Sequence, residues 1–212
     1  MSGPDGVNRP FHARRAVVAL LAGAALSACT SGNGGAASAG ADTAAQRRLD
    51  AVLVGSDREL PDADADLVNA VGLQASTLGV STRDFWSVID DPATPAAERL
   101  ARADAVLARM RDTTASMRDR ALGARTELVR DALLPYADRW SGIVRALTRV
   151  RAAVANGDRA ARQAATDDAD VLAAQLADLD RARVARVVAV LGPDEARRLL
   201  AREGLDPGRF GL

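Results

Sequence analysis

The sequence predicts an all-α fold, an antiparallel bundle of about four long helices with additional short ones. Apolar residues make up 48% of the 212-residue chain but aromatic residues only 3%, so alanine, leucine and valine must form most of the core. Alanine and leucine are strong helix formers, and apolar positions recur at helical intervals in several segments. No segment shows the sustained alternation of β-branched residues that half-buried strands would require. The chain is long enough to form a sizeable core.

The first part of the predicted domain contains two short helices or one broken helix. Residues 43–59 and about 61–78 carry helix-forming residues, and a proline at position 61 suits the start of a helix. We expect Gly79 to end the second helix, because glycine is frequent just past a helix C-terminus.

The segment RDFWSVIDDP, residues 83–92, is predicted to connect two helices. It concentrates apolar side chains in a chain with few aromatics, namely Phe85, Trp86, Val88 and Ile89. The favoured interpretation is that this connector folds back to cap the core, with Tyr136 and Trp140 as neighbours. The alternative is an exposed interaction patch formed by Phe85, Trp86 and Ile89, since aromatic residues are enriched in interface cores.

Three later segments carry apolar residues at intervals of three and four. The first stripe consists of Leu100, Ala103, Leu107, Met110, Thr114, Met117 and Ala121. The second consists of Val129, Leu133, Tyr136, Trp140, Ile143, Leu147, Val150 and Val154. The third consists of Ala165, Ala169, Leu172, Leu176, Leu179, Val184, Val187 or Val188, and Leu191. Such stripes lay one apolar face along each helix and predict bundle packing.

Residues that favour helix ends divide these segments. Thr94 followed by Pro95 predicts an N-cap and a first helical turn. The Asn-Gly-Asp sequence at 156–158 supplies a C-terminal stop and the next N-cap. The Gly-Pro pair at 192–193 ends one helix and opens a short last helix, which Gly204 is expected to close.

Three local features leave alternatives open. Gly123 marks either a tight turn between two helices or a position inside one very long helix. Pro135 interrupts the second stripe, yet the pattern resumes in register, which favours a kink over a full break. Phe210 and Leu212 in the tail either dock on the domain or stay free.

Two groups of aspartates are candidates for cation binding. The first group is Asp62, Asp64 and Asp66, and the second is Asp167, Asp168, Asp170, Asp178 and Asp180. A calcium loop of the EF-hand type would need glycine and glutamate where Leu67 and Leu73 stand. We therefore interpret the first group as acidic residues in a first helical turn, and the second as a solvated helix face. No metal site is predicted.

A short apolar run precedes the only cysteine of the chain. Arg14 and Arg15 form a positive segment, and residues 16–25 form an apolar run of the length found in signal peptides. The run is too short to span a membrane. It is followed by Leu26, Ser27, Ala28 and Cys29. This segment resembles the bacterial lipobox, which implies cleavage between Ala28 and Cys29 and transfer of a diacylglycerol to the cysteine thiol.

The resemblance implies a domain organisation and a location. Residues 1–28 are expected to be a signal peptide, 29–42 the lipidated cysteine with a flexible Gly/Ser-rich linker, 43–205 the helical bundle domain, and 206–212 a tail. Two acyl chains give stable attachment, so we expect a lipid-anchored protein at the extracytoplasmic face of the cell membrane. The residues around the arginine pair fit twin-arginine export poorly, which favours the general secretory route.

Composition excludes several kinds of chemistry in the expected mature domain. The only histidine, His12, lies within residues 1–28, and the chain contains no lysine. With Cys29 acylated, Ser-His-Asp and Cys-His catalysis, Schiff-base chemistry and zinc sites with nitrogen or sulfur ligands are excluded. Residues 1–28 hold three arginines and one aspartate, so the remainder carries 25 basic and 27 acidic side chains. This balance argues against nucleic-acid binding.

These observations predict a non-enzymatic binding or regulatory lipoprotein without a cofactor. The layout is similar to that of accessory lipoproteins of envelope-stress sensor-kinase systems in actinobacteria, and the all-arginine basic composition is typical of high-GC coding. The similarity implies a membrane or cell-envelope protein, such as a sensor kinase, as partner. Three alternatives stay open: a carrier of an apolar ligand held between helices, an enzyme that uses only carboxylates and arginines, and a bundle that self-associates.

Overall fold

The computed structural model describes residues 47–202 and 207–212, and all of its regular structure there is helical. Residues 47–54 form a short helix. The long helices are α2 (Asp62–Ile89), α3 (Ala96–Leu122), α4 (Glu127–Ala155) and α5 (Arg159–Leu191). They are followed by α6 (Pro193–Arg202) and the 3₁₀ helix η2 (Pro207–Phe210). The predicted signal peptide, lipobox and linker, and the predicted stop at Gly204, lie outside the described residues.

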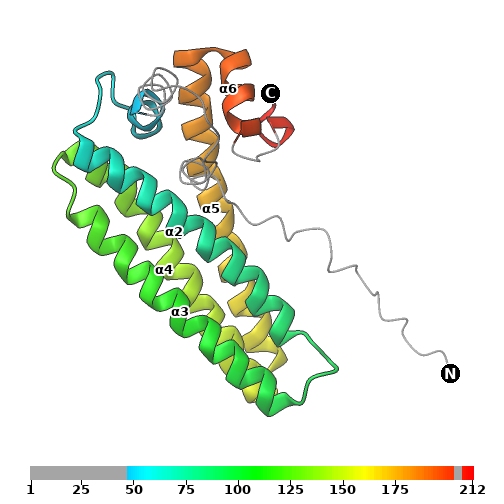
Figure 1. Cartoon of the computed structure of the whole chain (residues 1–212). Helices are drawn as coiled ribbons and strands as arrows, with labels where there is room; N and C mark the ends of the chain where they lie inside the picture. Colours follow the sequence, from blue (N-terminus) through cyan, green and yellow to red (C-terminus); the bar gives the residue numbers. More distant parts are fainter. Residues whose placement is uncertain (1–46, 203–206) are drawn as a thin grey trace, which may run out of the picture.

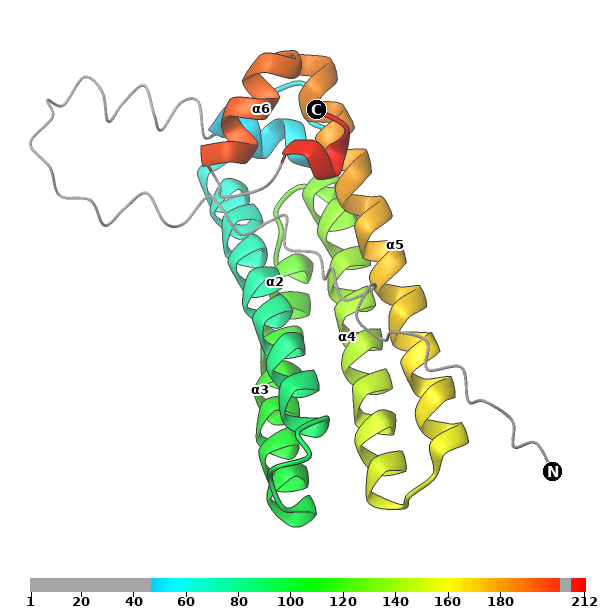
Figure 2. The ribbon, with the colours of Figure 1, turned by 90° about the vertical axis from the view of Figure 1, so that its right-hand side faces the viewer.

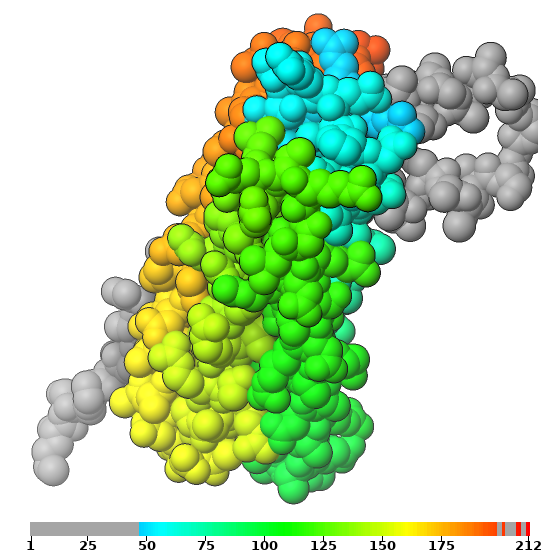
Figure 3. Space-filling view, turned by 90° about the vertical axis from the view of Figure 1, so that its left-hand side faces the viewer, coloured from blue at the N-terminus to red at the C-terminus, as the bar shows by residue number. Residues whose placement is uncertain are grey.

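The four long helices form an antiparallel bundle, as the sequence predicts (Figure 1). α4 packs against both α3 and α5, and α2 packs mainly against α3 and less extensively against α4. α5 extends past the beginning of α4. It reaches the end of the molecule where residues 47–54, α6 and η2 lie together (Figure 2). The space-filling view shows the elongated shape that results (Figure 3).

Two hydrophobic clusters form the interior. The large cluster runs along α2, α3, α4 and the first part of α5, and Trp140, Tyr136 and Phe85 are its largest fully buried side chains. The small cluster joins Leu49 and Val52 of the short helix to Val187 of α5 and Ala196 of α6, with Leu212 packed against it. Leu212 of the tail therefore docks on the domain.

The predicted stripes of α3 and α4 are confirmed. Every member of both stripes is buried except Leu100 and Val154, which are partly buried and pack against the large cluster. The stripe of α5 is buried at Ala165, Ala169, Leu176, Val184 and Val187. Periodicity thus identified the packing faces of these helices, because burial of one face supplies most of the stability of a helix in a bundle.

The predicted stop at Gly79 is wrong, because α2 continues through it to Ile89. Gly79 is buried, and the apolar face continues beyond it through Thr82 and Phe85. Burial of that face outweighs the roughly 1 kcal/mol that glycine costs inside a helix. Most of the segment predicted as a connector is therefore the last two turns of α2.

The predicted N-cap at Thr94 is also wrong. Pro95 occupies the N-cap position of α3 without a side-chain cap, and the Thr94 hydroxyl instead donates to Oδ2 of Asp91 at 2.6 Å. Oδ1 of Asp91 accepts the Ala93 N–H at 2.9 Å. The hydrogen bond from Thr94, followed by that from Ala93, lowers the pKa of Asp91.

The other helix ends agree with the sequence. Gly123 is the C-cap of α3, which settles the open alternative in favour of a turn, and α4 continues through Pro135. Asp158 caps α5 by accepting the Ala161 N–H at 2.9 Å. Gly192 separates α5 from α6 with a φ of 85°, a left-handed conformation that glycine adopts at little cost.

None of the described helices is both long and apolar enough to cross a membrane.

Gly142 lies where α4 packs closely on Leu172 of α5. A Cβ atom at this position would lie 2.9 Å from Cδ1 of Leu172 on α5. We expect Gly142→Leu to lower the free energy of unfolding, because overpacking costs about 1–3 kcal/mol and exceeds the roughly 0.8 kcal/mol gained in helix propensity. Urea denaturation measures the change, and Ala152→Leu at an exposed site of α4 is the matched control. Equal stability of the two variants would contradict the close packing.

Candidate functional site

A buried pair of opposite charges lies on α5, between the two hydrophobic clusters. Asp180 and Arg183 are only 1% and 4% exposed. Residues three apart share a helix face, and these two occupy the face that carries Leu176 before them and Val187 after them. Buried ionisable groups are rare unless they are paired or serve a function, so this pair is the strongest candidate site among the described residues.

Arg183 ties α5 to α4. Its Nη2 donates a hydrogen bond to the main-chain oxygen of Ala132 at 2.9 Å, and its Cζ lies 3.8 Å from the centre of the Tyr136 ring. A guanidinium over an aromatic face is attracted by the ring quadrupole. Burial lowers the pKa of Arg183 to about 10, against the opposing effect of Asp180, so the side chain is still charged at neutral pH. Its Nη1 is buried without a hydrogen-bond partner.

Asp180 is buried with no donor to its carboxyl group. Neither Oδ1 nor Oδ2 has a hydrogen-bond partner among the described residues. Burial raises the pKa of Asp180 to about 7, although Arg183 and then Arg181 act in the opposite direction. A carboxyl group with this pKa binds and releases a proton near neutral pH, which is the chemistry that the arrangement can perform.

A second arginine of α5 reaches the short helix. Nη2 of Arg186 donates to the main-chain oxygen of Leu53 at 2.9 Å. In the same short helix Asp50 is buried, and its Oδ2 accepts a hydrogen bond from Nδ2 of Asn69 on α2 at 3.2 Å. The last part of α5 is therefore joined to α4 through Arg183 and to residues 47–54 through Arg186. We call this region, defined by Asp180, Arg183 and Arg186 with their contacts, the α5 joint.

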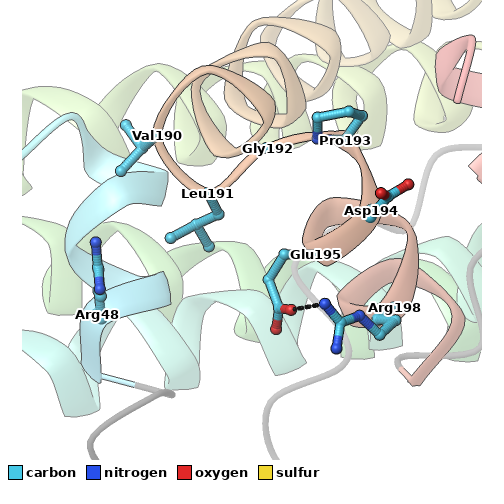
Figure 4. A pocket seen from close by; sticks show the side chains of 8 residues that line it. All are labelled: Arg48, Val190, Leu191, Gly192, Pro193, Asp194, Glu195 and Arg198. Carbon is cyan, nitrogen blue, oxygen red and sulfur yellow. Dashed lines mark ion pairs between the residues drawn. The ribbon is translucent and has the colours of Figure 1, made fainter.

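An open pocket of about 410 Å³ lies beyond the α5 joint, where α5 meets α6 (Figure 4). It is lined by Arg48, Val190, Leu191, Gly192, Pro193, Asp194, Glu195 and Arg198. Nη2 of Arg198 lies 2.7 Å from Oε2 of Glu195, one turn earlier on α6. Two basic and two acidic side chains give the pocket no net charge, and its polar lining does not suit a large apolar ligand.

The predicted interaction patch is not an exposed surface. Phe85 and Ile89 are 0% and 1% exposed and belong to the large cluster, while Trp86 is partly buried against it. The Phe85 and Trp86 rings contact edge to face, with centroids 5.5 Å apart. The contact-patch interpretation fails for Phe85 and Ile89 because both are core positions of α2. The other predicted site residues, Leu26, Ser27, Ala28 and Cys29, lie outside the described residues.

The aspartate groups are not assembled into a cation site. In residues 47–202 and 207–212 no three histidine, cysteine or acidic side chains lie close enough to hold a metal ion. Most members of both groups are exposed, and Asp168 forms an ion pair with Arg149 at 3.0 Å. Asp62 and Asp64 lie in the first turn of α2, as predicted, although Asp64 is only 0% exposed. The interpretation of the second group as a solvated helix face is wrong for Asp180, which is 1% exposed.

Asp64 joins the start of α2 to the turn between α3 and α4. Its Oδ1 accepts the main-chain N–H of Arg125 at 2.8 Å, and its Oδ2 accepts that of Thr126 at 3.0 Å. Thr126 in turn caps α4 by accepting the Val129 N–H. Carboxylates that accept main-chain N–H groups form strong, charge-assisted hydrogen bonds, so Asp64 has a structural role.

Sequence reasoning missed the α5 joint, although a signal was present. Asp180 follows Leu176 by four residues, and Arg183 follows Asp180 by three. Val187 comes four residues after Arg183, so all of them share one helix face. The predicted stripe passed around them through Leu179 and Val184. A charged pair in stripe register is the feature that could have indicated the site.

The chain was compared with protein-family models, with curated protein sequences and with solved structures, and none of them matches it.

Proposed function

We propose that the protein is an extracytoplasmic lipoprotein, anchored in the cell membrane through Cys29, whose helical domain is a non-enzymatic binding or regulatory module. The observation that carries the proposal is the sequence Leu26-Ser27-Ala28-Cys29 after an arginine pair and an apolar run. The absence of any second cysteine in the sequence supports it, because a disulfide partner for Cys29 is then lacking within the chain.

The proposed partner is a membrane or cell-envelope protein, with a sensor kinase of an envelope-stress system as the expected class. A helical bundle supports this role, because long helices can present extended side-chain faces to a partner. The nearly balanced charge beyond residue 28, with 25 basic and 27 acidic side chains, does not favour a nucleic acid as partner. The lining of the pocket between α5 and α6 does not favour the alternative, a carrier of an apolar ligand, because four of its side chains are charged.

Cys29→Ala tests the anchor. We expect the native chain to partition into the membrane fraction and to carry a diacylglycerol on a new N-terminal cysteine, since two acyl chains hold a protein stably on a bilayer whereas one chain binds only marginally. The variant is expected to carry no diacylglycerol and to keep residues 1–28, which include the apolar run. Detergent phase separation and intact mass spectrometry measure both properties.

Ser31→Ala, two residues beyond the cysteine, is the matched control and is expected to behave as the native chain. A native chain without added lipid mass, or a Cys29→Ala variant that is cleaved before residue 29 and gains the same lipid mass, would contradict the proposed anchor.

A further inference from the structure

We propose that Asp180 and Arg183 form a proton-controlled latch between α5 and α4. With Asp180 protonated, Arg183 stays on the Ala132 oxygen and the Tyr136 ring, as in the structure. Loss of the proton draws the guanidinium to the Asp180 carboxylate and releases its contacts with α4. The inference does not depend on the lipid anchor, because all of its residues belong to the helical domain.

The unsatisfied atoms of the pair complement one another. Asp180 has two acceptor oxygens without a donor, and Arg183 has one terminal nitrogen, Nη1, without an acceptor. A rotation of the Arg183 side chain towards Asp180 would satisfy these atoms together, at the loss of the hydrogen bond to Ala132 and the ring contact. The two arrangements therefore exchange one set of polar contacts for another.

Protonation decides between the two arrangements. A buried carboxylate without a partner is strongly unfavourable, whereas a buried neutral carboxyl group costs much less. The observed contacts of Arg183, which leave the Asp180 oxygens unpaired, therefore suit the protonated acid. Removal of the proton makes a charge-assisted pair with Arg183 the favourable arrangement, because breaking or omitting such a buried pair leaves an uncompensated charge.

The ionisable groups of the elements around Asp180 are arginines, one tyrosine and one aspartate. On α5, Arg181 and Arg183 favour its ionised form, and Arg186 acts in turn on Arg183. α4 carries Tyr136, whose hydroxyl is buried without a partner, and Arg139, whose Nε is likewise unpartnered. The short helix at 47–54 carries the buried Asp50, which accepts from Asn69.

The only histidine of the chain is His12, far away in the sequence. A transition near neutral pH that depends on residue 180 can therefore be assigned to its carboxyl group.

The latch would loosen one end of the domain. When Arg183 turns towards Asp180, α5 loses the hydrogen bond from Arg183 to the main-chain oxygen of Ala132 on α4. Beyond that point α5 carries Val187 of the small cluster and leads into α6. We expect a rise in pH through 7 to increase the mobility of this end while the large cluster stays folded.

The fluorescence of Trp140 reports on the latch in the full chain. Trp140 is fully buried on α4, one turn from Tyr136, and Trp86→Phe leaves it as the only tryptophan, since the chain has two. We expect emission to change in one transition with a midpoint near pH 7, while far-UV circular dichroism stays constant. Asp180→Asn in the Trp86→Phe background is expected to abolish the transition. Asp178→Asn, at an exposed site two residues away, is expected to retain it.

Hydrogen exchange of the unsubstituted chain gives a second measurement that needs no variant. After correction for the intrinsic pH dependence, residues 176–191 should exchange at least about tenfold faster at pH 8 than at pH 6, and α3 should not. An emission transition that persists in Asp180→Asn, or equal corrected exchange at both pH values, would overturn the proposal.

Discussion

Raising the pH from 4 to 8 is expected to reduce the free energy of unfolding of the native chain by up to about 4 kcal/mol relative to Asp180→Asn. Burial raises the pKa of Asp180 from 3.8 to about 7, and each unit corresponds to about 1.4 kcal/mol. Between these values the folded state holds a proton that the unfolded state has lost. Stability therefore falls as the pH rises from about 4 to about 7 and is constant above that range.

Urea denaturation at a series of pH values measures this difference. Asn is neutral at every pH, so the variant should match the native chain near pH 4 and exceed its stability at pH 8. Asp178→Asn removes an exposed carboxylate from the same helix and should follow the native pH dependence. A constant difference between the native chain and Asp180→Asn from pH 4 to 8 would show that Asp180 is not buried as an unpaired acid.

Asp64→Asn is expected to lower the free energy of unfolding by about 3 kcal/mol. The carboxylate accepts two main-chain N–H groups from the α3–α4 turn, and hydrogen bonds to a charged group contribute about 1.5–3 kcal/mol each. The Asn oxygen can keep one of them, but its NH₂ group faces the other N–H and leaves that donor unsatisfied. The change should appear in urea denaturation and as faster hydrogen exchange at Arg125 and Thr126.

Asp66→Asn is the matched control, because Asp66 is exposed on the same helix two residues further on. We expect its stability to stay within about 0.5 kcal/mol of the native value. If Asp64→Asn were as stable as Asp66→Asn, the hydrogen bonds from the α3–α4 turn to Asp64 would not contribute to the free energy of unfolding.

The fold could be predicted from the sequence because it follows from local patterns. The stripes of α3 and α4 repeat every three and four residues over their whole length, and the Asn-Gly-Asp and Gly-Pro sequences mark both ends of α5. These signals depend on residues close together in the chain. Gly79 misled the prediction because its local preference is outweighed by burial of the α2 face on which it lies.

The roles of Asp64 and Asp180 could not be predicted in the same way. The partners of Asp64 are 61 and 62 residues away in the sequence, so its hydrogen bonds have no local signal. Only its burial has one, because Asp64 is in helical register with the buried Val68 and Val71, whereas its exposed neighbours Asp62 and Asp66 are not. Asp180 is buried because the part of α5 that contains it and Arg183 packs against α4 near Ala132 and Tyr136. Burial of a charged residue depends on which helix covers it, which is decided by the tertiary arrangement.

The latch would make the proposed regulatory role depend on pH. An anchored module outside the cytoplasm is exposed to the external pH, and the α5 joint would convert that pH into a change at one end of the domain. Binding of a partner that prefers one arrangement of Arg183 would then depend on pH, since a ligand shifts a two-state equilibrium only by its difference in affinity for the two states.

The most direct test of the proposed function is crosslinking in intact cells followed by affinity capture, with the native chain compared with Cys29→Ala. We predict that the native chain captures one specific membrane or cell-envelope protein and that the variant, without its anchor, loses it. Capture of no specific protein by the native chain, or of the same protein by both chains, would contradict a membrane-anchored regulatory module.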